Sequence, residues 1–266
     1  MDTPESASFQ LVAPYYDTIM RDVPYKEWMR YLVRLLKYRE HRGKRVLDLA
    51  CGTGSVSDLL AASGIDVVGV DLSEGMIEAA KRKAARKKLS IEYYVQDAAH
   101  LDLPGPPFDL CVSLFDSLNY ILSPEQLQEA MNRVFAHLSP GGLFIFDINS
   151  AFALENSFFD QDNLESTDKL RYVWRSSYDP KTRLCTVAMR FFHRQRNGID
   201  GEFRETHVQF AYREEELIGM LNTAGFEKIE TFHAYSMHPV HSTTDRIFFI
   251  ASRPTTNDER PMTKSR

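Results

Sequence analysis

Several aspartates in this sequence stand where they could bind a polar ligand, each directly after a short apolar stretch of the kind that forms a buried strand. They are Asp48, Asp71, Asp97 and Asp116. Residues 48–54 read Asp-Leu-Ala-Cys-Gly-Thr-Gly and precede a predicted helix, residues 55–63. Glycine allows a tight turn and a close approach of ligand to backbone, and the helix start offers free N–H groups. This strand, turn and helix therefore predict a cradle for a nucleotide-like ligand.

A second signal follows at a suitable distance along the chain. Asp71 ends a predicted strand, residues 66–70, and stands nineteen residues after Gly52. A carboxylate at this place can accept two hydrogen bonds from a ribose diol. The two signals together predict a ligand that contains a ribose.

These residues resemble the motifs of the class I methyltransferases that use S-adenosylmethionine. The first motif of that family runs acidic-x-Gly-x-Gly-x-Gly, and residues 48–54 match it with Ala50 in place of the first glycine. We expect the Ala50 methyl group to be tolerated there if the φ angle is negative. Residues 96–98 and 115–120 match the adenine-contacting segment and the loop beside the reactive methyl group. The resemblance covers roughly residues 40–150 and resumes from about 213 to 252.

The resemblance implies S-adenosylmethionine as cofactor, together with a set of residues that contact it. Tyr16 lies in a Tyr-Tyr-Asp segment and is expected to close over the methionyl end of the cofactor. Asp48 is expected to accept hydrogen bonds from the loop or to hold the cofactor amine, and simple bracing of the loop is the alternative. The expected cofactor contacts are Tyr16, Asp48, Ala50, Gly52, Gly54, Asp71, Leu72, Met76, Gln96, Asp97, Ala98, Phe115 and Asn119.

A site for a nicotinamide dinucleotide is the competing interpretation of the glycine loop. Residues 52–57 nearly match Gly-x-Gly-x-x-Gly, but Ser57 stands where that pattern expects a glycine or alanine. The dinucleotide pattern also gives no role to Asp48 or Asp97. Methyl transfer is therefore the preferred hypothesis.

Methyl transfer from a sulfonium is an in-line displacement, so the protein mainly aligns the nucleophile, the methyl group and the leaving sulfur. An amine acceptor needs only to lose its proton, whereas a hydroxyl acceptor needs a base or a metal. Tyr16, His193 and His238 are the predicted catalytic residues, and His207 and His233 are further candidate bases.

A metal site is weighed and not predicted. Asp116, Asp147 and Asn149 carry oxygen ligands suited to Mg²⁺. The metal-dependent catechol enzymes, however, carry adjacent Asp-Asn, and here Ile148 intervenes. Arg246 is expected either to bind an anionic substrate group or to face solvent.

Strand and helix patterns alternate through the rest of the chain. The predicted strands span residues 45–50, 66–70, 91–96, 108–115, 143–148, 227–233 and 245–252. The predicted helices span residues 55–63, 73–87, 123–138 and 213–224. The alternation predicts an α/β protein with a Rossmann-like, doubly wound, mostly parallel sheet of seven strands, whose ligands bind at the carboxyl ends of the strands.

Four parts of the chain are predicted to have separate roles. Residues 1–40 contain two helices, 9–20 and 25–40, and form an N-terminal lid. Residues 41–150 and 213–252 form the cofactor-binding domain. Residues 151–212 alternate with period two and form an antiparallel β-excursion, inserted after the fifth strand, that selects the substrate. Residues 253–266 form a disordered tail.

Composition limits the classes of partner. The chain has 266 residues, 43% of them hydrophobic, which suffices for one core with an inserted subdomain. A net charge of −5 does not favour nucleic-acid binding. Three cysteines without metal or redox spacing, and the lack of a membrane-spanning run or signal peptide, favour the cytoplasm. We expect a small-molecule acceptor and no nucleic-acid or membrane partner, and leave a homodimer open.

The predicted function is methyl transfer to a small molecule, with an amine nitrogen as first choice and a hydroxyl as second. The N-terminal helices and the β-excursion are similar to those of the glycine N-methyltransferases and the amino-sugar N,N-dimethyltransferases. A protein that binds S-adenosylmethionine without transferring its methyl group is the remaining alternative.

Overall fold

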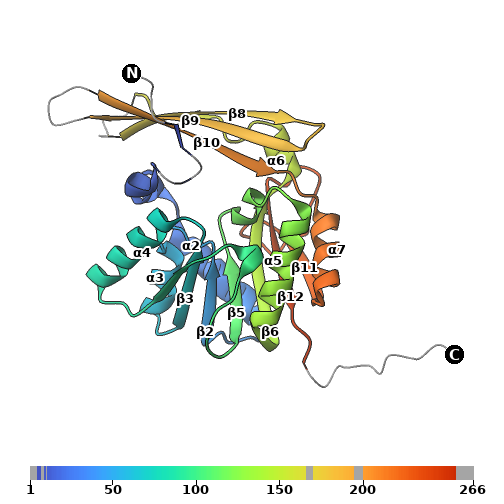
Figure 1. Ribbon diagram of the computed structural model, residues 1–266. Coiled ribbons are helices and arrows are strands. Elements are labelled where there is room, and N and C mark those ends of the chain that lie inside the picture. The colour runs from blue at the N-terminus through green and yellow to red at the C-terminus, as the bar shows by residue number, and fades with distance from the viewer. Residues whose placement is uncertain (1–4, 7–8, 10, 166–169, 195–199, 256–266) are drawn as a thin grey trace.

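Seven strands form the central sheet, in the order β11-β12-β6-β5-β2-β3-β4 (Figure 1). The parallel strands are β2 (Arg45–Leu49), β3 (Asp66–Asp71), β4 (Glu92–Val95), β5 (Phe108–Ser113) and β6 (Leu138–Asn149). β12 (Arg246–Ser252) is antiparallel to both β6 and β11 (Glu227–His233). The predicted seven-stranded, mostly parallel sheet is therefore confirmed.

The computed structural model of the protein describes residues 5–6, 9, 11–165, 170–194 and 200–255. Most of the tail predicted to be disordered, residues 253–266, lies outside these described residues. No helix in the described ranges is both long enough and apolar enough to cross a bilayer.

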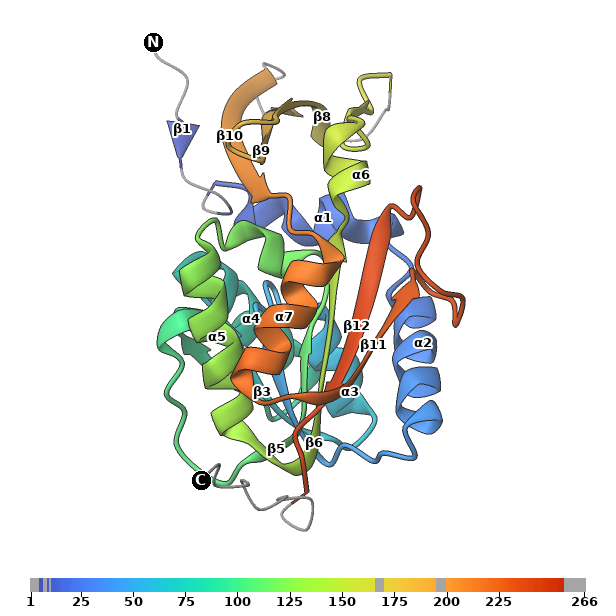
Figure 2. The same ribbon diagram turned by 90° about the vertical axis from the view of Figure 1, so that its right-hand side faces the viewer.

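Helices cover both faces of the central sheet (Figures 1 and 2). On one face lie α2 (Tyr25–Tyr38), α3 (Ser55–Ala62) and α4 (Glu74–Lys87), and on the other α5 (Pro124–His137) and α7 (Glu214–Ala224). The ends of three helices follow the sequence signals. Ser73 and Ser123 cap the starts of α4 and α5, and Gly225, with a φ of 100°, ends α7.

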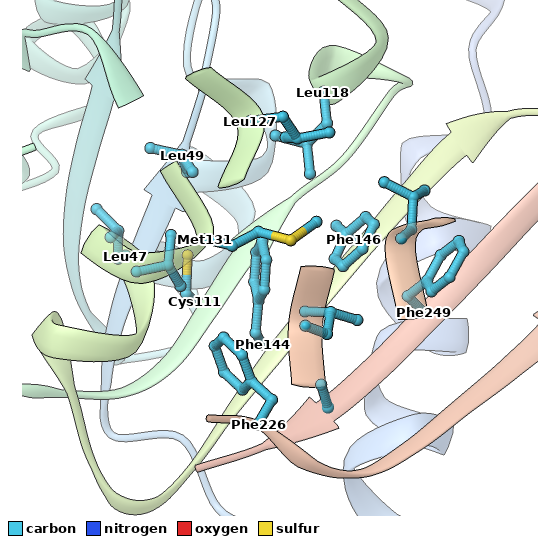
Figure 3. Close-up of a cluster of buried hydrophobic side chains, with 14 of the residues drawn as sticks. Leu47, Leu49, Cys111, Leu118, Leu127, Met131, Phe144, Phe146, Phe226 and Phe249 are labelled. Carbon is cyan, nitrogen blue, oxygen red and sulfur yellow. The ribbon is translucent and has the colours of Figure 1, made fainter. Parts of the chain in front are cut away.

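The largest part of the core fills the space between the sheet and helices α5 and α7 (Figure 3). Phe146 of β6 and Phe249 of β12 stack with ring centroids 4.7 Å apart. Met131 of α5 and Phe226 after α7 pack against the same cluster. Burying each such side chain contributes roughly 1.5–3 kcal/mol, so this face fixes the strand ends that carry the polar residues.

A second sheet of five strands has the order β1-β10-β9-β8-β7 and lies above the central sheet in Figure 1. The predicted excursion corresponds to β8 (Leu170–Asp179), β9 (Leu184–Arg194) and β10 (Asp200–Phe210), which pair antiparallel. The helix α6 (Ala151–Glu155) precedes them. Two short strands were not expected, β1 (Glu5–Ser6) and β7 (Gln161–Asp162). Two residues are too few to show a period in the sequence.

The predicted helix over residues 9–20 is wrong. This segment forms three short turns: η1 (Ala13–Tyr15), α1 (Tyr16–Ile19) and η2 (Met20–Asp22). The backbone N–H groups of Leu11 and Val12 donate to the carboxylate of Glu205, at 2.6 and 2.9 Å. These N–H groups therefore hydrogen-bond to β10 and not within a helix.

Close packing against Tyr93 explains why β3 contains a glycine. A Cβ atom placed on Gly69 would lie 2.6 Å from two ring carbons of Tyr93 and 3.0 Å from Cys51 Sγ. The phenol ring of Tyr93 therefore crosses the strand at the place where a side chain is missing.

We predict that Gly69→Ala lowers the free energy of unfolding by about 1–3 kcal/mol, because the methyl group must displace a buried ring. Gly219→Ala is the matched control, since a Cβ there meets nothing within 4 Å and the residue lies inside α7. This control should raise stability by about 1 kcal/mol. Urea denaturation of both variants measures the difference, and equal stability of the two would contradict the packing argument.

Candidate active site

A large cavity lies where the second sheet faces the carboxyl ends of the parallel strands, and its volume is about 1260 Å³. Typical ligand sites measure about 300–1,000 Å³, so this cavity has room for two small molecules side by side. Its lining includes the four aspartates that the strand pattern placed at strand ends, Asp48, Asp71, Asp97 and Asp116.

The glycine loop after β2 forms one wall of the cavity. Gly52 and Gly54 have φ angles of 54° and 76°, and a Cβ on Gly52 would meet no atom within 4 Å. Ala50 has a φ of 57°, so the condition for an unstrained methyl group at this place, a negative φ, is not met. A left-handed conformation costs an alanine about 1–2 kcal/mol, so the loop carries this strain.

Asp71 connects the glycine loop to the start of α4. Its carboxylate accepts the N–H of Gly52 at 2.7 Å and the N–H of Ser73 at 2.8 Å. Burial raises the pKa of this carboxyl, and the two backbone donors oppose the shift. Each carboxylate oxygen has a further lone pair, so the group can accept additional hydrogen bonds from a ligand.

Asp48 is buried and accepts a hydrogen bond from the Ser57 hydroxyl of α3. Burial raises the pKa of the Asp48 carboxyl to about 7, and the bond from Ser57 opposes the rise. The structure thus supports the bracing role that was the alternative for Asp48, between β2 and α3.

The segment after β4 is held by its own side chains. Gln96 pairs through its amide with both the N–H and the carbonyl of Asp102, at 2.9 and 3.0 Å. Asp97 accepts the Ala99 N–H at 2.9 Å and so caps the short helix η3 (Ala98–His100). Gln96, Asp97 and Ala98 all line the cavity.

A buried ion network lies at the carboxyl ends of β5 and β6. The guanidinium of Arg246 donates to Asp116 at 2.7 Å, to Asn149 at 3.0 Å and to Asp147. The register of β12 sets this position, because Arg246 pairs with Asn149 of β6. The expectation that Arg246 faces solvent is therefore wrong, and two carboxylates of the chain already pair with the guanidinium that was expected to bind an anionic substrate group.

The same contacts involve the three oxygen-bearing residues suited to Mg²⁺. The guanidinium occupies the position among Asp116, Asp147 and Asn149 that a cation would need. Within the described ranges, no group of three or more His, Cys, Asp and Glu side chains is arranged to hold a metal ion.

Asp147 also shapes the loop after β5. Its carboxylate accepts the N–H of Phe115 at 2.7 Å and the N–H of Asp116 at 3.1 Å. Both of these loop residues have positive φ angles, 71° and 52°. The loop continues into the short helix η4 (Ser117–Tyr120), where buried Asn119 binds the backbone of Asn149 in both directions.

Aromatic side chains of the second sheet form the opposite wall. Tyr172 and Trp174 of β8 and Phe191 of β9 line the cavity, together with Phe158 and Phe159. Tyr16 lies between this wall and the strand ends. Burial raises the pKa of the Tyr16 phenol, and the nearby side chains of Tyr25, Tyr120, Asp116 and Asp71 raise it further.

A hydrogen-bonded row of side chains extends from the cavity into the second sheet. The Tyr120 hydroxyl lies 3.0 Å from His207 Nδ1, and His207 Nε2 lies 2.9 Å from a carboxylate oxygen of Glu205. Tyr120 and His207 line the cavity, and Glu205 lies behind them with no exposed side-chain surface.

Most of the expected cofactor contacts come together at the cavity. Those that line it are Tyr16, Asp48, Ala50, Gly52, Asp71, Leu72, Met76, Gln96, Asp97, Ala98 and Phe115.

The remaining expected residues lie elsewhere. Gly54 begins α3 beneath Tyr93, and Asn119 is buried in the contacts described above. His193 packs on Tyr15, with ring centroids 5.9 Å apart, and His238 is exposed in the loop before β12.

The sequence did not predict that β10 carries a row of polar side chains facing inward. Glu205, His207 and Gln209 are all buried and alternate along the strand. Their period-two spacing is visible in the sequence. Only the structure shows that this polar face points inward.

We predict that Asp48 makes the stability of the ligand-free protein fall as pH rises from about 4 to 7. The pKa of its carboxyl rises from 3.8 to about 7 on folding, so the folded state keeps a proton that the unfolded chain releases. The slope from one such proton is about 1.4 kcal/mol per pH unit. Asp48→Asn should remove this contribution in urea denaturation between pH 5 and 7.

Asp22→Asn serves as the control, since that side chain is 90% exposed. A wild-type slope in Asp48→Asn would show that the carboxyl has no raised pKa.

Comparison with known proteins agrees with this geometry. The model of a family described as "Methyltransferase domain" matches residues 46–142. A protein of Geobacillus sp. (strain WCH70), which carries a methyltransferase name, is 31% identical over 251 residues, covering 92% of this chain and 100% of that protein.

Two solved structures extend the comparison. An S-adenosylmethionine-dependent methyltransferase from Clostridium acetobutylicum ATCC 824 superposes with a TM-score of 0.81 at 30% identity, over 92% of this chain and 98% of the other. The sugar N-methyltransferase KedS8 from Streptoalloteichus sp. ATCC 53650 shares the fold, with a TM-score of 0.75 at 21% identity over 96% and 97% of the two chains. The chain therefore belongs to the S-adenosylmethionine-dependent methyltransferases and uses S-adenosylmethionine as its cofactor.

Proposed function

We propose that S-adenosylmethionine binds along the glycine loop, with its ribose at Asp71. This carboxylate keeps free lone pairs, and it is held in place by the N–H groups of Gly52 and Ser73. The methionyl end would lie toward Tyr16, at the centre of the cavity. The cofactor contacts expected from the sequence that line the cavity fit this placement.

The adenine ring would lie against apolar side chains beside Asp71. Leu72 lines the cavity although its side chain is 72% exposed, and Val95 is also exposed there. Met76 is buried beneath them. Exposed large apolar side chains at a cavity are suited to an aromatic ring. Asp97 lines the same cavity, and its carboxylate would accept a hydrogen bond from the adenine amine.

We infer that the acceptor atom is the nitrogen of an amine on a small molecule. The observation that carries this inference is the charge of the cavity wall. Among the described residues that line the cavity, the carboxylates are Asp48, Asp71, Glu74, Asp97 and Asp116, and the one arginine or lysine is Arg246. The guanidinium of Arg246 is taken up by Asp116 and Asp147.

Such a wall disfavours acceptors that carry a carboxylate or a phosphate, because none of its described residues offers a free cation to neutralise them. It accommodates a neutral or cationic amine. The faces of Tyr172, Trp174 and Phe191 would pack against the body of that amine and attract its positive charge. The sugar N-methyltransferase with the same fold is consistent with this choice without establishing the acceptor.

The mechanism requires alignment rather than an elaborate set of catalytic groups. S-adenosylmethionine supplies an activated methyl group on its sulfonium. Tyr16 and the loop of Phe115 and Asp116 would hold the acceptor in line with that methyl group and exclude water from it. A hydroxyl acceptor is the second candidate, because His207 in the cavity wall offers the base that a hydroxyl would need.

We predict that Asp71→Asn weakens S-adenosylmethionine binding about 10- to 100-fold, because a charge-assisted hydrogen bond is worth roughly 1.5–3 kcal/mol. Asp66→Asn is the matched control, since Asp66 is exposed at the opposite end of the same strand. Calorimetric titration of both folded variants measures the dissociation constants. Unchanged affinity in Asp71→Asn would contradict the proposal that this carboxylate binds the ribose.

A panel of neutral small amines and matched alcohols tests the acceptor class. We expect S-adenosylhomocysteine release with aromatic or cyclic amines, and mass spectrometry should show an N-methyl product. Amino acids with a free carboxylate should be poor acceptors. Methylation of the alcohols but not of the amines would replace the first candidate by the second.

A further inference from the structure

We propose that Tyr120 receives the acceptor's proton and passes its own phenol proton to His207, which Glu205 holds in the required tautomer. This inference rests on the proposed amine acceptor and assigns a route for the proton that methylation must release. Its geometric basis is the hydrogen-bonded row of 3.0 Å between Tyr120 and His207 and 2.9 Å between His207 and Glu205.

The contacts of Glu205 define the hydrogen positions along the row. Its carboxylate accepts the backbone N–H groups of Phe9, Leu11 and Val12 at 3.1, 2.6 and 2.9 Å. A carboxylate that also accepts from His207 requires the imidazole proton to sit on Nε2. His207 Nδ1 then carries a lone pair and accepts the hydrogen bond from the Tyr120 hydroxyl.

The Gln209 side chain also hydrogen-bonds to the Tyr120 hydroxyl, which leaves one lone pair of this oxygen for the cavity. Burial raises the pKa of the Tyr120 phenol, and the charge of Asp116 raises it further, so the group remains a neutral phenol. A neutral phenol can take a proton only while it gives its own away. His207, at 3.0 Å, is the base in a position to receive it.

The proton and electron balance is complete with these residues. The nitrogen lone pair of the acceptor forms the N–C bond as the C–S bond breaks, and the sulfur keeps the bonding electrons. The N–H proton moves to the Tyr120 oxygen, and the phenol proton moves to His207 Nδ1. The resulting imidazolium lies against the Glu205 carboxylate, which compensates its charge.

Charged and aromatic groups surround the row. Asp116 faces Tyr120, and the guanidinium of Arg246 pairs with this carboxylate at 2.7 Å. Phe9 covers the row, with its ring centroid 4.5 Å from that of His207 and 5.1 Å from that of Tyr120. The Phe9 ring thus covers the row on the side of the N-terminal segment, and the row faces the cavity on its other side. Tyr120 is the catalytic residue, and His207 and Glu205 are positioning residues.

A purely structural row, which only anchors the N-terminal segment, is the competing interpretation. The tautomer of His207 tests the hydrogen positions that the transfer requires, and the kinetics of Tyr120→Phe then separate the two interpretations. In the wild-type protein, ¹⁵N NMR of the imidazole should show a proton on Nε2 and a hydrogen-bonded lone pair on Nδ1. Glu205→Gln should reverse this pattern, because the new amide donates to Nε2. A proton on Nδ1 in the wild-type protein would overturn the proposal.

Kinetics with the best amine of the acceptor panel provide the second test. Tyr120→Phe should lower kcat about 10²- to 10⁴-fold, the usual contribution of acid–base catalysis, with S-adenosylmethionine affinity unchanged. Tyr94→Phe is the matched control, since the Tyr94 hydroxyl binds Glu92 and does not line the cavity. Wild-type kcat in Tyr120→Phe would refute the transfer role even if the tautomer is as expected.

The outcomes distinguish this proposal from the proposed function. If alcohols alone are methylated and their turnover depends on Tyr120, the amine acceptor is wrong and the proton route stands. If amines are methylated equally well by Tyr120→Phe, the acceptor class stands and the proton route is wrong.

Discussion

The active-site end of the molecule depends on one partly buried cation, the guanidinium of Arg246. Asp116 and Asp147 are both buried, and a pair of uncompensated carboxylates would be very costly there. Arg246 supplies the compensating charge from the antiparallel strand β12, which enters the sheet beside β6. Without it, the buried side chain of Asp147, which accepts the N–H groups of the loop after β5, would lack a compensating charge. The antiparallel strand β12 therefore also fixes the loop after β5, which lines the cavity.

In the second sheet, the buried carboxylate of Glu205 likewise holds together segments that are distant in the chain. It gathers three backbone N–H groups of the N-terminal segment and the imidazole of His207. These donors come from segments about 195 residues apart in the chain. The N-terminal segment thus reaches the cavity because it hydrogen-bonds to the sheet and not because it forms a helix. The lid role proposed for residues 1–40 would depend on this contact.

The sequence predicted the features that depend on local periodicity and on short motifs. The strand and helix alternation, the helix caps at Ser73 and Ser123, and the aspartates at the strand ends all follow from neighbouring residues, and the structure confirms them. The positions of Arg246 and of the N-terminal segment could not be predicted this way. Both depend on partners about 100 or more residues away, Asp147 and Glu205. A single sequence contains no local signal of such pairing.

The two loops that meet at the cavity share a physical property that motif matching does not show. Ala50, Phe115 and Asp116 all have positive φ angles, although none of them is a glycine. Such conformations cost about 1–3 kcal/mol each and persist only where surrounding contacts impose them. Asp147 imposes them after β5, and the clamp of Asp71 on Gly52 holds the other loop. The strain is therefore stored in two loops that line the same cavity. Because the contacts that hold it are buried and charged, the loops are set before either substrate binds, and binding energy is not used to shape them.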